Sequence, residues 1–218
     1  MIDLYFWNTP NGYKPLIMLE ELGCAYNIKT IDISNNEQFD PDFLKISPNN
    51  KIPAIVDTKP QNVEAPISVF ESGAILIYLA EKYKKLFPQR KDVKFDVLQW
   101  VFWQVGSLGP MKGQAHHYWR FAKEDHPYSK KRYRDETVHL LGVLNRQIDS
   151  RKFICGDEYT IADIMSYPWI SSLETLEIDL ENFTNVKKWH DRLSERPAIR
   201  RAYESGEAAV TKKPAEEE

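Results

Sequence analysis

Apolar and polar positions alternate in short runs through residues 1–85, and each run has the period of a strand or of a helix. Helical spacing of apolar residues covers Leu16–Leu22 and Gly73–Tyr83, and Gly23 follows the first of these runs as a helix stop. The pattern predicts strands at Ile2–Trp7, Tyr26–Ile33, Pro53–Asp57 and Ile67–Phe70, the last two as an antiparallel pair. The predicted order is therefore β-α-β followed by β-β-α.

Strand patterns stop after the segment around Pro88, and only helical periodicity follows. It covers residues 95–118, 128–149, 161–176 and 185–196. We therefore expect an α/β plus all-α protein, with a thioredoxin-like domain at residues 1–85 and an all-helical C-terminal domain at residues 86–204. The segment 205–218 is small, charged and poor in large apolar residues, so we expect a mobile tail there.

One helix start in the C-terminal half carries its own cap signal. Thr160 can accept from a backbone N–H of the first turn while Asp163 reaches back, and Tyr159 can pack against Ile164. A cap of this kind contributes about 0.5–2 kcal/mol to stability. We assign it to folding rather than to chemistry.

Charge and cysteine content narrow the function classes. A net charge of −3 gives no general attraction to nucleic acid or to an anionic membrane, and no apolar run approaches the roughly 20 residues that cross a bilayer. The chain starts without a recognisable signal peptide. Cys24 and Cys155 form no C-x-x-C motif or disulfide framework, which favours a reducing, cytoplasmic location. No histidine pair has metal-ligand spacing, so we expect no metal.

Glu71 and Ser72 stand where the last predicted strand gives way to a helix. A hydroxyl and backbone N–H groups at a helix start favour a carboxylate, because the helix dipole places partial positive charge there. The Glu71 carboxylate can pair with an ammonium group. Together the two residues predict a receptor for an amino-acid head group.

Ile52 and Pro53 precede another predicted strand. An X-Pro bond is the one peptide bond for which the cis form is cheap. A cis bond here would leave the Ile52 backbone available to pair with a peptide ligand.

Thr9–Gly12 ends the first predicted strand. In thioredoxin-like folds this place holds the reactive sulfur, yet the segment carries no cysteine, tyrosine or serine. Read alone, it is an ordinary turn. Together with the Glu71–Ser72 and Ile52–Pro53 signals, the segment is better interpreted as part of a site. Thr9 and Asn11 can donate to a thiolate beside a helix start, and such donors and the helix dipole lower a thiol pKa. The sulfur would then belong to the ligand.

These segments together resemble a glutathione transferase, and more narrowly its nu class, which includes bacterial relatives of the globular domain of a yeast nitrogen-regulatory prion protein. The N-terminal segments that carry the resemblance are Leu4–Phe6, Thr9–Gly12, Ser47–Asp57 and Phe70–Ile75. The C-terminal ones include Leu98–Trp100, Trp103–Gly106, Leu108–Met111, Gly113–Gln114, His116–His117, Pro127–Tyr128, Lys131–Tyr133 and Ile161–Ile164. The resemblance implies that the helical half is a glutathione-transferase C-terminal domain.

The resemblance also implies roles for individual residues. Thr9 and Asn11 match residues that face the glutathione sulfur, and the Ile52 backbone before Pro53 matches the group that pairs with the cysteinyl part. The remaining matches are Glu71 and Ser72 for the γ-glutamyl end, Gln38 and Lys51 near the glycyl end, and Arg132 for an arginine that reaches the ligand from the neighbouring subunit of a homodimer. Without the resemblance, Arg132 is a solvated charge in a basic helical run.

The activity implied is glutathione-dependent disulfide reduction, in which bound glutathione replaces a protein cysteine pair. Glutathione, reduced or oxidised, is thus the expected cosubstrate, with small disulfides or electrophiles as partners. General conjugation of glutathione to electrophiles is one alternative, for which Trp103, Gly106, Pro110, His117 and Tyr118 are candidate pocket residues. A non-catalytic glutathione-binding regulator is the other. The chain begins at the first strand without the Asn/Gln-rich extension of the yeast protein, which counts against a regulator.

Overall fold

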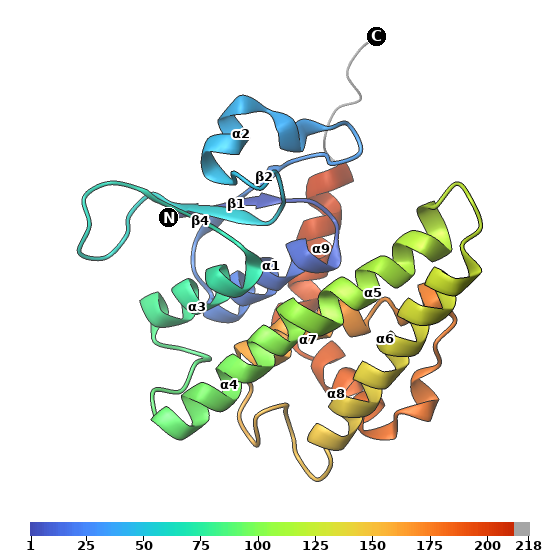
Figure 1. The fold of residues 1–218 in the computed structure, drawn as a ribbon. Helices are drawn as coiled ribbons and strands as arrows, with labels where there is room; N and C mark the ends of the chain where they lie inside the picture. Colours follow the sequence, from blue (N-terminus) through green and yellow to red (C-terminus); the bar gives the residue numbers. More distant parts are fainter. Residues whose placement is uncertain (212–218) are drawn as a thin grey trace. The chain divides into compact units, whose positions relative to one another are not determined.

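The computed structural model describes residues 1–211 and divides the chain into two compact units (Figure 1). Of the described residues, one unit contains 1–85 together with 195–211, and the other is Leu86–Ser194. The first unit is therefore not continuous in sequence. Its last helix, which follows the all-helical segment, returns to the N-terminal unit.

The first unit is built on a mixed four-stranded sheet. Its strands are β1 (Ile2–Phe6), β2 (Tyr26–Thr30), β3 (Ala54–Asp57) and β4 (Ile67–Phe70), in the order β2-β1-β3-β4. β1 pairs in parallel with β2 and antiparallel with β3, and β3 pairs antiparallel with β4. This confirms the thioredoxin-like fold and the antiparallel pair predicted from the sequence, with each strand slightly shorter or equal in length.

The helices of the described part of this unit are α1 (Pro10–Leu22), α2 (Pro41–Ile46), α3 (Ser72–Tyr83) and α9 (Pro197–Thr211), with a 3₁₀ turn at Glu37–Phe39 before α2. α1 lies against both α3 and α9 (Figure 1). α1 begins six residues earlier than its apolar spacing predicted, because Thr9 caps it and Pro10 occupies its first position. The short helix α2 was not predicted.

The second unit is helical throughout its regular structure. Its helices are α4 (Lys91–Trp103), α5 (Gly109–His116), α6 (Pro127–Gln147), α7 (Ile161–Ile170) and α8 (Thr184–Ser194), with π-helical turns at Gln104–Leu108 and His117–Phe121 and 3₁₀ turns at Leu173–Leu176 and Leu180–Asn182. α5 packs on α6, α4 on α7, and α6 on α8. The helix predicted over residues 95–118 is thus a helical run interrupted twice by a wider turn.

The capping box at the start of α7 is present as predicted. Asp163 is fully buried, and its carboxylate accepts from the backbone N–H of Thr160 (3.0 Å), from that of Ile154 (3.0 Å) and from Trp189 Nε1 (2.9 Å). The cap therefore joins α7 to the preceding loop and to α8. Its function is structural.

The predicted mobile tail at 205–218 is wrong over residues 205–211, which form the last part of α9. Gly206 lies against the core: a Cβ built on it would be 2.7 Å from Tyr13 Cε1 and 2.9 Å from Phe6 Cζ. An ion pair from Arg196 to Glu21, with distances of 2.6 and 2.8 Å, holds the start of the same helix. Small residues that look uninformative in sequence are what allow this close packing. Residues 212–218 lie outside the described part of the chain.

The packing of α9 gives a prediction for stability. A Gly206→Val substitution places methyl groups where Tyr13 and Phe6 already lie, and we expect a loss of about 1–3 kcal/mol in the free energy of unfolding, measured with urea. Ala208→Val adds similar bulk at an exposed position of the same helix and should cost only the small helix propensity of valine, about 0.5 kcal/mol. Equal effects at the two positions would contradict a packed α9.

Candidate functional site

A small cavity of about 150 Å³ lies in the first unit, where two helices and a strand begin. It is lined by Asn11, Ser47, Lys51, Ile52, Pro53, Phe70, Glu71 and Ser72. The start of α1, the loop that enters β3 and the start of α3 therefore meet there. Six of the predicted site residues are brought together: Asn11, Lys51, Ile52, Pro53, Glu71 and Ser72. The Ile52–Pro53 peptide bond is cis.

Glu71 and Ser72 form the helix-start side of the cavity. Ser72 is the first residue of α3, and Glu71 is its N-cap with φ of 67°, in the left-handed region that non-glycine residues seldom occupy. Such a conformation costs on the order of 1–3 kcal/mol and persists where the surrounding structure imposes it. The positive end of α3 and an acidic side chain thus face the same small space, which suits a zwitterionic head group.

Lys14 does not itself line the cavity, but it contacts two residues that do, and sequence reasoning missed it. It stands on α1 one turn after Asn11, and only 2% of it is exposed. Its Nζ lies 2.9 Å from Asn11 Oδ1 and 3.3 Å from Ser72 Oγ. Burial lowers the pKa of Lys14 well below its usual value, and the negative charge of Glu71 opposes that shift. The available signal was a lysine three residues after Asn11, directly before the apolar run Pro15–Leu19.

Thr9 does not line the cavity. Its Oγ1 accepts a hydrogen bond of 3.1 Å from the Gly12 N–H and so caps α1. Gly12 is required at this point, because a Cβ there would lie 2.2 Å from the carbonyl oxygen of Trp7. Thr9 thus shapes the helix start that presents Asn11.

Gln38 and Arg132 also lie outside the cavity lining. Gln38 lies in the 3₁₀ turn before α2, with its Oε1 buried and without a hydrogen-bond partner among the described residues. Arg132 lies on α6 of the second unit, in an open hollow that also contains Tyr128, Lys131, Asp135, Glu136 and His139. Arg132 therefore belongs to the second unit, whereas the cavity belongs to the first.

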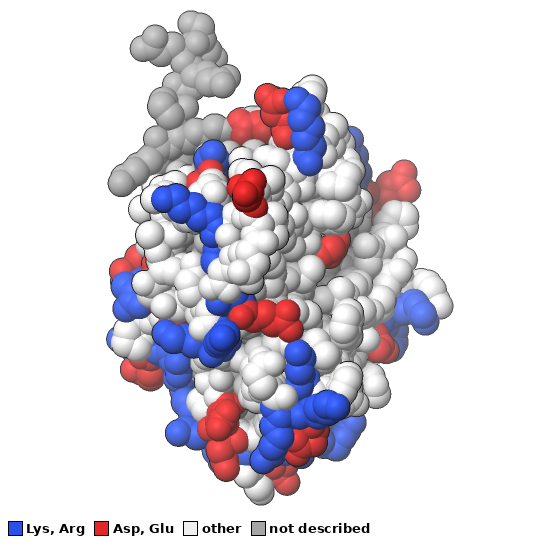
Figure 2. Space-filling view, turned by 90° about the vertical axis from the view of Figure 1, so that its left-hand side faces the viewer, with Lys and Arg blue, Asp and Glu red and all other residues white. Residues whose placement is uncertain are grey.

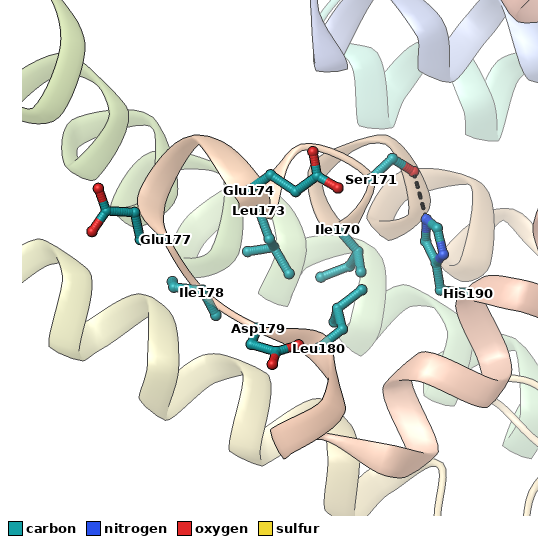
Figure 3. Close-up of a pocket in the computed structure, with 9 residues that line it drawn as sticks. All are labelled: Ile170, Ser171, Leu173, Glu174, Glu177, Ile178, Asp179, Leu180 and His190. Carbon is teal, nitrogen blue, oxygen red and sulfur yellow. Dashed lines mark hydrogen bonds between the residues drawn. The ribbon is translucent and has the colours of Figure 1, made fainter.

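A larger hollow of about 450 Å³ lies within the second unit (Figure 3). Aliphatic side chains gather around it in Figure 3, and Ser171 Oγ lies 3.0 Å from His190 Nε2 at one end. The lining is Ile170, Ser171, Leu173, Glu174, Glu177, Ile178, Asp179, Leu180 and His190. Burial lowers the pKa of His190, and its ring stacks on Tyr167. None of the residues predicted for the site lies there.

The second unit also buries a lysine. Lys112 on α5 is 2% exposed, and its Nζ lies 2.5 Å from Ser172 Oγ. Burial lowers the pKa of Lys112 to about 7. It lines neither the hollow of Figure 3 nor the open one beside Arg132.

The cysteines lie apart from the small cavity, and Cys155 lines another hollow together with Arg90 and Asp157. Both cysteines are free thiols, neither lines the small cavity, and burial raises the pKa of Cys155. Within residues 1–211, no group of three or more His, Cys, Asp or Glu side chains is placed to hold a metal ion, and no helix has the length and apolar character needed to span a membrane. Figure 2 shows basic and acidic side chains interspersed on one face of the molecule.

Comparisons with known protein families match both parts of the chain. The model of the glutathione S-transferase N-terminal domain matches residues 2–81. The model of the glutathione S-transferase C-terminal domain matches residues 110–197. The first match contains every residue that lines the small cavity.

Individual relatives match over nearly the whole length. Disulfide-bond oxidoreductase YfcG of Escherichia coli is 47% identical over 202 residues, which cover 93% of this chain and 94% of that protein. A glutathione transferase family member of Pseudomonas fluorescens, solved with two glutathione bound, is 40% identical with a TM-score of 0.87, and the match covers 92% and 91% of the two chains. A glutathione transferase of Pseudomonas putida, solved with one glutathione disulfide per subunit, is 38% identical with a TM-score of 0.86, covering 92% and 90%.

The buried amine gives a pH-dependent stability. Because burial lowers the pKa of Lys14, the unfolded chain holds a proton that the folded protein lacks between the folded pKa and about 10.5, and stability due to this group rises with pH in that window. Lys14→Met removes the titration. We expect the stability of this variant, relative to that of the unsubstituted protein, to be greatest at low pH and to decrease toward pH about 10. Urea unfolding across this pH range measures the difference.

The matched control is Lys45→Met on α2, whose lysine is exposed and whose pKa is raised by its ion pair with Asp42. The stability contributed by Lys45 is present below its unfolded pKa and is lost only as pH rises through the folded pKa, so the control should not reproduce the trend. A Lys14→Met difference that is constant with pH would contradict the assigned shift.

Proposed function

The chain belongs to the glutathione S-transferase family, and we propose that it is a glutathione-dependent disulfide-bond oxidoreductase in which bound glutathione supplies the reactive sulfur. One observation carries the proposal. The cavity at the starts of α1 and α3 is lined by protein groups that can bind an amino-acid head group and by hydrogen-bond donors, and neither cysteine of the chain lines it. The reductase identity is supported by 47% identity to a disulfide-bond oxidoreductase over most of both chains.

We assign the two ends of glutathione from charge and donor type. The γ-glutamyl carboxylate would meet Ser72 and the N-terminus of α3, while its α-ammonium would pair with Glu71. The backbone of Ile52, before the cis Pro53, would pair with the cysteinyl residue. Lys51 would meet the glycyl carboxylate, and Gln38 would assist from the neighbouring turn.

The sulfur would then lie near the start of α1, where the Asn11 amide and the helix dipole favour a thiolate. Thr9 would act with Asn11, through the helix start that it caps. The glutathione thiolate attacks a disulfide substrate, forming a mixed disulfide and releasing one substrate thiolate. A second glutathione thiolate attacks the glutathione sulfur of that mixed disulfide, which gives glutathione disulfide and releases the second substrate thiolate.

The related structures support both the start and the product of this reaction. The Pseudomonas fluorescens protein holds two glutathione and the Pseudomonas putida protein holds one glutathione disulfide. A site of this family can therefore accommodate the two sulfur atoms that the exchange requires. We propose the same occupancy for this chain.

We further propose membership of the nu class, a homodimer and a cytoplasmic location. In the dimer, Arg132 of one subunit would reach the glutathione carboxylate in its neighbour, for which a forked guanidinium is well suited. Two free thiols, Cys24 and Cys155, support a reducing compartment. We expect no nucleic-acid or membrane partner at a net charge of −3.

Asn11→Ala tests the reductase proposal directly. Loss of the amide removes a thiolate donor, and we expect kcat for coupled reduction of hydroxyethyl disulfide to fall by about 100-fold. Asn27→Ala, at an exposed position of β2 outside the cavity, is the control and should retain full activity. Equal activity of the Asn11 variant and the unsubstituted protein would overturn the proposal. A faster conjugation of chlorodinitrobenzene than disulfide reduction would favour the conjugating alternative.

Glu71→Gln tests the head-group assignment. The change preserves shape but removes the charge that pairs with an ammonium group, so glutathione affinity measured by calorimetry should fall by roughly 10-fold or more. Glu64→Gln, at an exposed position in the same unit, is the matched control and should bind normally. Unchanged binding by the Glu71 variant would contradict the assigned orientation, and absent binding by the unsubstituted protein would contradict a glutathione site.

A further inference from the structure

We propose that Lys14 is a positioning residue of this site, which fixes the Asn11 amide and the Ser72 hydroxyl so that both present donors to glutathione. The inference rests on the proposed function. Its basis is geometric: the Lys14 amine lies between the first turns of α1 and α3, 2.9 Å from Asn11 Oδ1 and 3.3 Å from Ser72 Oγ. With 2% exposure, its polar end has no access to bulk water.

The first consequence concerns the orientation of the Asn11 amide. An asparagine amide has an accepting oxygen and a donating NH₂ group, and a lysine ammonium only donates. Lys14 Nζ therefore selects the orientation in which Oδ1 faces the amine and Nδ2 lies on the other side. Asn11 lines the cavity, so the end directed to a ligand sulfur is the donor. The opposite orientation would set an oxygen against a thiolate.

The second consequence concerns Ser72. Its hydroxyl oxygen accepts from Lys14 Nζ, which leaves the single hydroxyl hydrogen to be donated in another direction. Ser72 also lines the cavity at the start of α3. The same amine thus prepares a donor for the γ-glutamyl carboxylate and a donor for the sulfur.

The third consequence is electrostatic. Burial disfavours the charged form of Lys14, and Glu71 favours it. A bound carboxylate and thiolate add negative charge near the amine and favour its protonated form further. By reciprocity, protonated Lys14 stabilises the thiolate, so removing it should raise the pKa of bound glutathione.

The test uses Lys14→Met, which keeps the volume and removes both the donor and the charge. The thiolate absorbance of bound glutathione, titrated with pH, should show a thiol pKa higher by about one unit. In the disulfide assay kcat near pH 7 should fall about 10-fold or more. In an Asn11→Ala background the same change should shift the thiol pKa less than it does alone, because the orientation effect acts through Asn11. Lys45→Met, on the exposed face of α2, is the control without effect.

The outcomes separate cleanly. A folded Lys14→Met protein with the original thiol pKa and kcat would show that Lys14 only fills space and would overturn the inference. If the Met variant does not fold, Lys14→Gln removes the charge but keeps a neutral donor; a raised thiol pKa would then support the electrostatic part of the inference, and an unchanged thiol pKa would overturn it. An unsubstituted protein that binds glutathione but reduces no disulfide would refute the proposed function, while the thiol titration would still decide the role of Lys14.

Discussion

The amine of Lys14 holds together the starts of two helices that are far apart in the chain. Its contacts with Asn11 and Ser72 join α1 to α3 across 58 positions of sequence. Removing a charged amine from water costs roughly several kcal/mol, which hydrogen bonds and a nearby carboxylate must offset. Asn11, Ser72 and Glu71 contribute to this compensation, and all three line the small cavity. The arrangement of the cavity therefore depends on one buried amine.

The rest of the first unit supports that arrangement. Thr9 caps α1 and so fixes the first turn, which carries Asn11, and Gly12 permits the close approach of the Trp7 carbonyl. On the other side of α1, α9 packs through Gly206 on the aromatic side chains of Tyr13 and Phe6. In the reaction that we propose, the protein contributes donors, a dipole and a head-group receptor, while the ligand contributes the sulfur. The sulfur of the ligand then takes the place of a protein nucleophile, and the side chains of the site orient it.

Much of this unit could be predicted because its signals are local. The strand pattern, the cis Ile52–Pro53 bond and the Glu71–Ser72 helix start all lie within a few neighbouring residues, and the structure has each of them. The boundaries of α1 were less accurate, because apolar spacing marks only the buried face of a helix. Caps and first-turn residues such as Pro10 carry no apolar signal and extend the helix beyond it.

The sequence by itself determined the family, the order of strands and helices, and the residue types around the cavity. Only the tertiary structure decided that Lys14 is an internal residue and that residues 205–211 form part of a packed helix. Both depend on partners distant in sequence: Ser72 for Lys14, and Tyr13 with Phe6 for Gly206. By its local sequence, a lysine is expected on the surface, and a segment of small residues is expected to form a weak helix. Burial by partners distant in sequence changes both expectations. The burial that gives each residue its role is a property of the folded chain, not of the local sequence.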